Sequence, residues 1–348
     1  MRGRFAASNR LPSFVCLVPG RPLPPSIYGG YAPAIGWDER AARVIDAIEA
    51  ISGRHPGCRT VHAKGTICSA VFTPTPEAAA LCRAAHFRGR SVRAHVRFSN
   101  GSGDPAAPDF EPREGRGIAT KFYLPDESTT DVVAITLPAF FVRTVEGFLD
   151  FTRARRPDPE TGEPDPDAIA TFLGEHPEAV VAATAVITAQ PPESYLRCAY
   201  NALHTFRFVA PDGGARFVRY RFEPEAGEAV LSAEDAAARG PDYLQRDLAE
   251  RLALGPATFR LSVQVAEDGD PIDDPTVPWP ENRQVVALGR LEVTGVAHDR
   301  EQGDDVLVFD ATRVTDGIEL SDDPILRFRS DAYAESVLRR SGVARDRP

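Results

Sequence analysis

The stretch Val92-Arg93-Ala94-His95-Val96-Arg97-Phe98 alternates apolar and polar side chains at every position. Successive side chains of an extended chain point to opposite faces, so its four apolar residues share one face and its three basic residues share the other. The pattern predicts a β-strand that packs one face against a core and turns the other face to polar surroundings.

Seven further runs have the composition of strands. With the first run they span residues 66–73, 91–98, 117–124, 131–137, 204–209, 215–222, 257–265 and 286–293. The turn signal Pro211-Asp212-Gly213-Gly214 separates two of them and is typical of an antiparallel hairpin. Eight such runs, mostly in one block, favour a closed antiparallel barrel of the α+β class over a parallel α/β sheet.

Helical patterns lie around and between these runs. Ordered structure is expected from near Trp37, where Asp38 can cap a helix, and Thr75 can cap a short helix that begins at Pro76. Further helices are expected near residues 144–155, 166–188, 232–239 and 242–254. Residues 266–281, rich in aspartate and proline, are expected to form a long connection that wraps the barrel.

Composition limits the functional classes. The 348 residues carry a formal net charge of −10, which disfavours nucleic acid or an anionic membrane as a partner. No segment has the roughly 18 continuous apolar residues of a membrane span. The five cysteines include no Cys-x-x-Cys pair, so neither a disulfide framework nor a zinc site is expected.

The first residues of the chain differ from the rest. Residues 1–34 are rich in proline and are expected to form an N-terminal arm ahead of a single domain at 35–348. The sequence leaves open whether this segment is an arm, an export signal or the result of a mis-set start. Its apolar stretch at 11–18 is short and interrupted, which favours a cytoplasmic location and leaves periplasmic export open. The oligomeric state, including a homo-oligomer, is also open.

Two short motifs far apart in the chain carry the chemistry. In Arg329-Ser330-Asp331-Ala332-Tyr333 the arginine and the tyrosine are four residues apart, so in a helix the guanidinium can reach the phenol. A tyrosine keeps its proton to about pH 10 unless a cation or a metal lies beside it. Val61-His62-Ala63-Lys64-Gly65 supplies a histidine that can move protons near neutral pH. Taken alone, the first motif is typical of a surface pair and the second of a structural histidine.

Seven segments resemble, in order, the core of the haem catalases. They are Arg59 to Gly65, Val96 to Ser99, Gly115 to Tyr123, Pro138 to Arg143, His204 to Phe206, Phe309-Asp310 with Gly317 to Glu319, and Arg329-x-x-x-Tyr333. The match covers roughly residues 55–342, and the chain looks like the small catalase-related haem peroxidases. This resemblance implies a catalase-like eight-stranded antiparallel β-barrel with surrounding helices, without the C-terminal additions of full catalases.

The resemblance assigns residues to the two sides of a heme b group (iron protoporphyrin IX). His62 matches the distal histidine, and Ser99 matches the serine that orients its ring. Tyr333 matches the tyrosinate that coordinates the iron, with Arg329 favouring its ionised form. These roles are what the resemblance implies, and each residue also has an ordinary structural explanation.

The other matched residues surround the expected haem. His204 and Asp323 match the groups that hydrogen-bond and balance Arg329, and Asp323 also suits a helix cap. Matches to the propionate-binding arginines and to apolar residues near the haem are Arg59, Arg97, Arg340, Val61, Phe141 and Phe148. Surface salt bridges and core packing are the alternative explanations for these six.

One departure from the catalase pattern bears on activity. Catalases carry an Asn-Asn pair ahead of the Pro-x-Phe-Phe stretch, where this chain has Ile135 and Thr136. The amide donor is missing at these two positions, and Thr136 is the candidate for a weaker hydroxyl donor. An apolar Ile135 favours a bulkier, organic hydroperoxide over efficient disproportionation of hydrogen peroxide.

The resemblance therefore implies a haem-dependent peroxidase. It would reduce organic hydroperoxides, with hydrogen peroxide left open as a substrate, by heterolytic O–O cleavage at a tyrosinate-ligated ferric haem. His62 would transfer the proton, and an unidentified electron donor would restore the resting enzyme. The alternatives are a hydroperoxide isomerase or dehydratase of the allene-oxide-synthase type, a weak catalase, and a non-enzymatic haem carrier or peroxide sensor.

Overall fold

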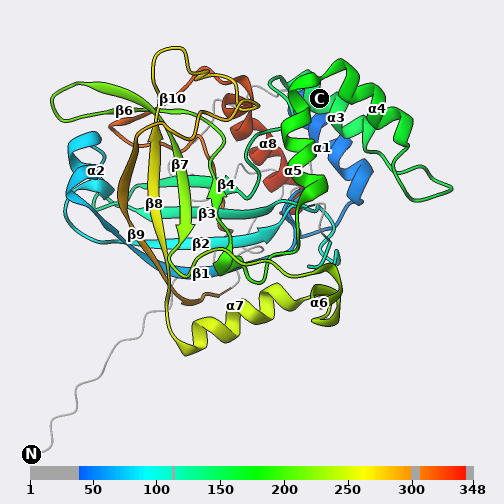
Figure 1. Ribbon diagram of the computed structural model, residues 1–348, viewed down its shortest axis with the longest axis horizontal. Coiled ribbons are helices and arrows are strands. Elements are labelled where there is room, and N and C mark those ends of the chain that lie inside the picture. The colour runs from blue at the N-terminus through cyan, green and yellow to red at the C-terminus, as the bar shows by residue number, and fades with distance from the viewer. Residues whose placement is uncertain (1–38, 112–113, 299–305, 342–348) are drawn as a thin grey trace, which may run out of the picture.

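The computed structural model describes residues 39–111, 114–298 and 306–341 (Figure 1). Its strands are β1 Gly65–Pro74, β2 Val92–Asn100, β3 Arg116–Tyr123, β4 Thr129–Ile135, β5 Tyr200–Asn201, β6 Phe206–Val209, β7 Ala215–Pro224, β8 Ala257–Val265, β9 Val285–Val296 and β10 Ile318–Leu320. Its α-helices are α1 Glu39–Ser52, α2 Pro76–Leu81, α3 Val145–Ala154, α4 Pro166–Glu175, α5 Val180–Thr188, α6 Ala233–Ala238, α7 Tyr243–Leu254 and α8 Pro324–Arg340. The arm expected at 1–34 and the cap expected at Asp38 lie outside the described residues.

The strands close into a barrel, as the sequence predicts. Neighbouring strands follow the order β1, β2, β3, β4, β5, β7, β8, β9 and return to β1, and every pairing is antiparallel. The ring of ribbons is visible on the left of Figure 1. Closure leaves these strands without an open sheet edge.

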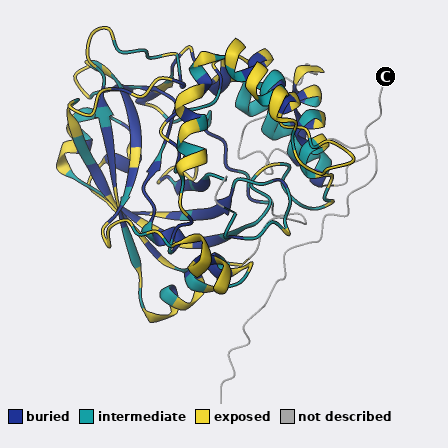
Figure 2. Cartoon of the chain, turned by 45° about the vertical axis from the view of Figure 1, so that its right-hand side comes forward, coloured by how far each residue is buried: buried dark blue, intermediate teal, exposed yellow. Residues whose placement is uncertain are grey.

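The apolar face of the stretch 92–98 fills the barrel. Its four apolar residues belong to the main core cluster, and none is more than 7% exposed. Burying a large apolar side chain contributes about 1.5–3 kcal/mol. Strands β2 and β3 are accordingly coloured as buried over most of their length in Figure 2, whereas the outer helices α4 and α5 show much exposed surface.

The strand predicted at 204–209 is shorter in the structure than expected. The run expected at 204–209 is present as β6, and the short β5 precedes it along the same edge of β7. Tyr200 pairs with Phe222 and Phe206 pairs with Val218, so residues 202–205 interrupt a single irregular strand. The interruption takes His204 out of the strand ladder.

The predicted helices are found, with one correction. Thr75 Oγ1 accepts from Ala78 N and caps α2, as its position before Pro76 suggests. The sequence predicts a single helix at 166–188, and this prediction is wrong. The segment forms two helices, α4 and α5, which are separated by a short 3-10 turn that begins at Pro177. Proline lacks the backbone N–H that would continue α4, and it excludes the helical conformation at the residue before it.

Three helices form a layer beside the barrel. Helices α1, α3 and α8 pack against one another on the right of Figure 1. Apolar residues of α1 and α3 form one cluster, with Phe328 of α8 packed against it, and they are Val44, Ile45, Ile48, Val145 and Leu149. Val44, Ile45 and Ile48 are spaced so that they share one face of α1, which is the face that packs here.

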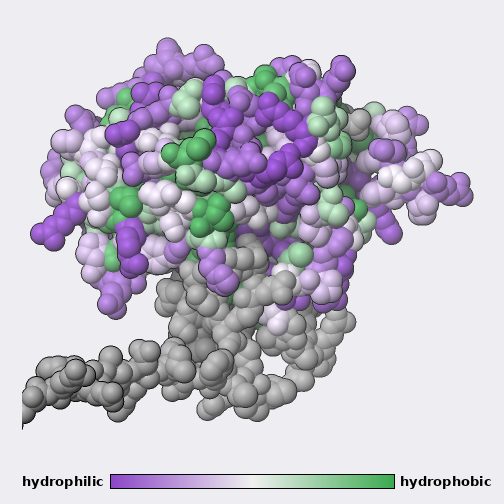
Figure 3. Space-filling model, turned by 90° about the horizontal axis from the view of Figure 1, so that it is seen from below, coloured by the Kyte–Doolittle hydropathy of each residue, from purple (hydrophilic) through white to green (hydrophobic). Residues whose placement is uncertain are grey.

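The connection 266–281 wraps the barrel as expected. Arg219 of β7 donates to backbone oxygens of this segment at Pro271, Asp274 and Val277, and its guanidinium lies 4.4 Å from the centre of the Trp279 ring. On the face shown in Figure 3, hydrophilic side chains predominate and hydrophobic ones form scattered patches. None of the described helices is both long and apolar enough to cross a bilayer.

Candidate active site

A cavity of about 280 Å³ lies where strands β2–β4 face the layer of α1, α3 and α8. All of the predicted site residues except Thr136 and Asp323 line its wall. They are Arg59, Val61, His62, Arg97, Ser99, Phe141, Phe148, His204, Arg329, Tyr333 and Arg340. Residues as far apart in the sequence as Arg59 and Arg340 therefore line one cavity, as a cofactor site requires.

His62 has an unusual backbone conformation. Its φ is +58°, a region that few residues other than glycine adopt and that often marks a functional position. Its Nδ1 lies 3.0 Å from Ser99 Oγ. Gly117 of β3 lies directly behind the ring, since a Cβ there would come within 2.9 Å of both His62 Cε1 and Ser99 Oγ. The histidine is thus held on both sides by β2 and β3.

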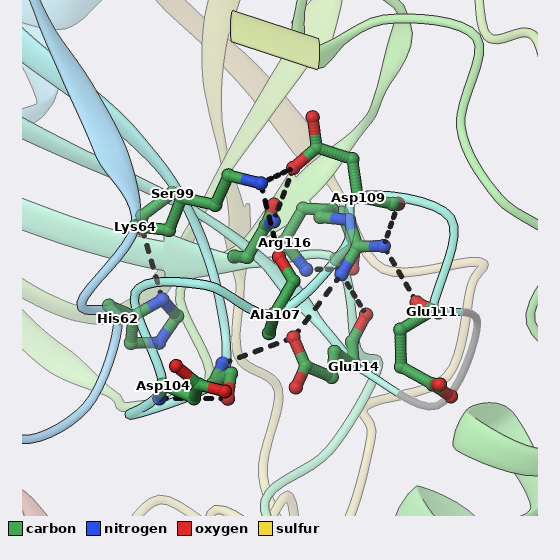
Figure 4. Close-up of polar contacts among 12 residues, drawn as sticks. His62, Lys64, Ser99, Asp104, Ala107, Asp109, Glu111, Glu114 and Arg116 are labelled. Atoms are coloured by element: carbon green, nitrogen blue, oxygen red, sulfur yellow. Dashed lines mark hydrogen bonds and ion pairs between the residues drawn. The ribbon is translucent and has the colours of Figure 1, made fainter. Parts of the chain in front are cut away.

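A buried polar network fixes the loop that carries His62 (Figure 4). The Lys64 ammonium lies 3.0 Å from Asp109 Oδ1 and donates to the backbone oxygen of Ala107. Asp109 is fully buried, and the same oxygen accepts from Asn100 Nδ2 at 2.8 Å. Asn100 N donates to Lys64 O and follows Ser99 directly. The network therefore joins the His62 loop to the strand that presents its hydroxyl partner.

The surroundings of His62 favour its neutral form. Burial, reinforced by the guanidinium groups of Arg97, Arg329 and Arg59, lowers the pKa of His62 to about 3. A neutral imidazole that shares its Nδ1 proton with Ser99 Oγ leaves Nε2 free to accept a proton. The position therefore suits a general base.

The α8 wall of the cavity carries the tyrosine motif. Arg329 Nη1 donates to Tyr333 Oη at 2.8 Å across one helical turn, as the spacing predicts. Asp323 both caps α8, accepting from Ile325 N at 2.8 Å, and pairs with His204 Nδ1 at 2.5 Å. The structure shows Asp323 as the cap of α8, and its role in balancing Arg329 stays a prediction.

Groups of opposite charge near His204 have opposite effects on its protonation. Burial and the nearby Arg329 lower the pKa of His204, while Asp323 acts in the opposite direction. His204 Nε2 and Arg329 Nε are buried, and neither has a hydrogen-bond partner within residues 39–111, 114–298 and 306–341. Asp323, His204 and Arg329 thus surround the tyrosine end of the cavity with polar groups, although Asp323 itself does not line it.

The cavity wall is strongly basic. Arg59 donates to Leu307 O at 2.7 Å, and Arg97, which is 3% exposed, donates to Ala63 O at 3.2 Å. Arg340 near the end of α8 is 8% exposed. With Arg329 these residues place four guanidinium groups on the wall, and the described lining contains no aspartate or glutamate. Such a wall suits a ligand that carries carboxylates.

Thr136 does not take the position that the sequence suggests. Its hydroxyl accepts from Arg116 N at 3.0 Å, and it does not line the cavity, whereas its neighbours Ile135 and Leu137 do. Alternation along the end of β4 explains this result, because residues on either side of a strand residue face the opposite way. Among the described residues, Thr136 is therefore not part of the cavity wall.

With the geometry in place, comparison with known proteins identifies the family. A family model described as Catalase matches residues 43–347. The chain belongs to the catalase family. It is 47% identical to a "Catalase-related peroxidase" of Mycolicibacterium paratuberculosis, with 87% of this chain and 95% of that protein aligned. It is 34% identical to a protein of the same name from Synechococcus elongatus, with 86% of this chain and 88% of that protein aligned.

Larger members of the catalase family match over part of their length. "Catalase-2" of Bacillus subtilis is 30% identical over 82% of this chain, which corresponds to 44% of that protein. The crystal structure of a fungal catalase superposes with a TM-score of 0.74 at 24% identity, over 95% of this chain and 67% of the other. The structural match confirms the catalase fold. Membership of the catalase family makes the chain an oxidoreductase that acts on peroxide.

Several lining residues were not among the predicted site residues. They are Thr60, Phe140, Asn201, Phe309, Phe328 and Ser336. Phe140 could have been predicted from the sequence, since it lies in the Pro-x-Phe-Phe stretch. Its ring stacks on that of Phe148, with 6.1 Å between the ring centres. Asn201 lies in a two-residue strand, which is too short to give a periodic signal.

The contact between Gly117 and His62 gives a testable expectation. Gly117→Ala should push the imidazole away from Ser99 and lower kcat/KM for hydroperoxide by about 10²-fold, because misplacement by about 1 Å can cost that much. Gly295→Ala is the matched control, since a Cβ there meets nothing within 4 Å. Steady-state kinetics of both haem-loaded variants test this. Equal, near-wild-type activity would show that Gly117 does not fix the ring.

Proposed function

We propose that this catalase-family chain is a haem peroxidase that reduces organic hydroperoxides with an external electron donor. One observation carries the proposal: His62 with Ser99, the Arg329–Tyr333 pair and three further arginines line one cavity whose other lining residues are mostly apolar. Its elements supply a proton-transfer group, a candidate iron ligand and partners for carboxylates.

The residues on the wall fit the haem that the catalase family generally binds. Haem b is a flat apolar ring with two propionates, and the wall combines apolar side chains with four arginines and no acidic residue among the described lining. Arg59, Arg97 and Arg340 would hold the propionates, because guanidinium groups pair well with carboxylates. Tyr333 would hold the iron, and Arg329 Nη1 donates to its phenol oxygen at 2.8 Å.

The chain's own contribution is proton transfer and orientation. Bound haem supplies the redox chemistry of O–O cleavage. His62 Nε2 takes the proton from the terminal oxygen of the hydroperoxide. It returns the proton to the oxygen that is bonded to carbon, so that an alcohol leaves. Ser99 holds Nδ1 and so keeps Nε2 directed into the cavity. Ile135 gives the wall an apolar surface that accommodates an organic substituent.

The pH dependence follows from the environment of His62. Its pKa of about 3 keeps the imidazole neutral through the physiological range. We expect kcat/KM for cumene hydroperoxide to stay level between about pH 5 and pH 8, and to fall only as the pH approaches the folded-state pKa. A fall with an apparent pKa near the ordinary value of about 6.5 would contradict this assignment.

A product balance tests the proposed function. Haem-loaded protein is given cumene hydroperoxide with a reducing dye, and the cumyl alcohol formed and the dye oxidised are measured together. Two one-electron oxidations of the dye for each alcohol support the peroxidase. Consumption of hydroperoxide without a dye requirement would point to an isomerase or dehydratase. Vigorous oxygen release from hydrogen peroxide on an oxygen electrode would identify a catalase instead.

A further inference from the structure

One cross-strand row runs over the barrel wall beneath the cavity. It consists of residues in register on neighbouring strands, and they are Gly65, Ser99, Gly117, Ile135, Asn201 and Arg221. Directly paired residues of a sheet point to the same face. Because Ser99 of this row holds His62, the side chain of Asn201 lies on the same face as the proton-transfer group.

Asn201 has hydrogen-bonding capacity to spare. Its Nδ2 donates to Leu137 O at 3.2 Å, which is the one hydrogen bond that its side chain makes within the described residues. A primary amide has two N–H donors and an oxygen acceptor, so one donor and Oδ1 remain. Asn201 is also the one carboxamide side chain in the described lining of the cavity. A neutral group with both a donor and an acceptor is therefore available to a ligand.

The row also fixes how far this amide is from the chemistry. Gly117 lies against the His62 ring, and Asn201 is two strands further along the row. Strands lie about 4.8 Å apart, so the Cα of Asn201 is roughly 10 Å from the Cα of Gly117, which lies against the imidazole. Ile135 occupies the position between them. The amide is too far away to act on the O–O bond and is placed to contact a remote part of a substrate.

We propose that Asn201 is a specificity residue of the peroxidase. Its second N–H donates to an oxygen of a carboxyl or ester group on the organic hydroperoxide. In this substrate an apolar segment, which lies against Ile135, separates that group from the hydroperoxide end. The substrate class is thus a chain-like hydroperoxide with a second oxygen function, as in oxidised fatty acids. This inference rests on the proposed function, because it assumes that the hydroperoxide reacts beside His62.

Kinetics with two hydroperoxides separate recognition from a purely structural role. In haem-loaded protein, Asn201→Leu should raise KM for 9-hydroperoxyoctadecadienoic acid about fivefold, as the loss of one neutral hydrogen bond implies. The kcat values for both hydroperoxides should stay at the wild-type level. The KM for cumene hydroperoxide, which has no second oxygen function, should also stay at that level. Asn282→Leu, at an exposed loop position away from the cavity, is the matched control.

Binding provides a readout that does not depend on turnover. The unreactive 9-hydroxyoctadecadienoic acid should bind the wild-type holoprotein in calorimetry about fivefold more tightly than it binds the Asn201→Leu holoprotein. Asn201→Asp is the second variant if the leucine variant does not fold. Asn201→Asp should weaken binding of the acid more than binding of its methyl ester, because two carboxylates repel each other.

The possible failures are distinguishable. Equal changes for both hydroperoxides, or unchanged KM and Kd for the acid, would overturn the role of Asn201 and leave the peroxidase standing. If wild-type holoprotein turned over neither hydroperoxide, the proposed function would fail, and unchanged calorimetric affinity in the variants would then reject the amide contact as well.

Discussion

An alanine in place of His62 should lower the rate of hydroperoxide cleavage by about 10²- to 10⁴-fold, the usual contribution of a positioned acid–base group. The variant should still bind haem, because Tyr333 and Arg340 lie on α8 and Arg97 lies on β2, outside the loop that carries His62. Single-turnover absorbance after mixing with cumene hydroperoxide measures the rate, and a haem titration measures binding.

The control for this substitution is His298→Ala. His298 is exposed and does not line the cavity, so its removal should leave both measurements unchanged. If His62→Ala cleaved hydroperoxide at close to the wild-type rate, the imidazole would not be the proton-transfer group, and the left-handed backbone at this position would need another explanation.

A phenylalanine in place of Tyr333 should weaken haem binding and change the ferric spectrum. The substitution removes the phenol oxygen that accepts from Arg329 and would coordinate the iron. Loss of a ligand should exceed the about 10- to 100-fold losses in metal affinity that follow removal of an outer partner. Absorption and electron paramagnetic resonance spectra of the ferric protein, with a haem titration, are the measurements.

Tyr123→Phe is the matched control for Tyr333→Phe. Tyr123 is also a partly buried tyrosine with a polar partner, His95, but it does not line the cavity. Its loss should leave the spectrum as it is. An unchanged ferric spectrum and haem affinity in Tyr333→Phe would remove the tyrosine from the coordination of iron.

Much of the fold could be predicted from local patterns. The strict alternation at 92–98 predicts which face of β2 fills the barrel, and the turn residues after Val209 predict the β6–β7 hairpin. The break between α4 and α5 was missed, although Pro177 is a local signal for it. β5 could not be predicted, since two residues carry no period.

The site is predictable in its residues but not in its distances. The resemblance to the catalases named the residues of the wall, and the cavity brings most of them together. The resemblance did not predict the position of Thr136. Which face a strand end presents is decided by a contact between strands, here the hydrogen bond from Arg116 N to the Thr136 hydroxyl. It also missed Asn201, whose position depends on the pairing of β5 with β4, a contact between distant segments.

The sharpest test of the account is a crystal structure of the haem-loaded protein. We predict one haem in the cavity, with the Tyr333 oxygen on the iron, His62 over the opposite face of the ring, and the propionates against Arg59, Arg97 and Arg340. Iron held by His62 or His204, or a haem bound outside this cavity, would contradict it.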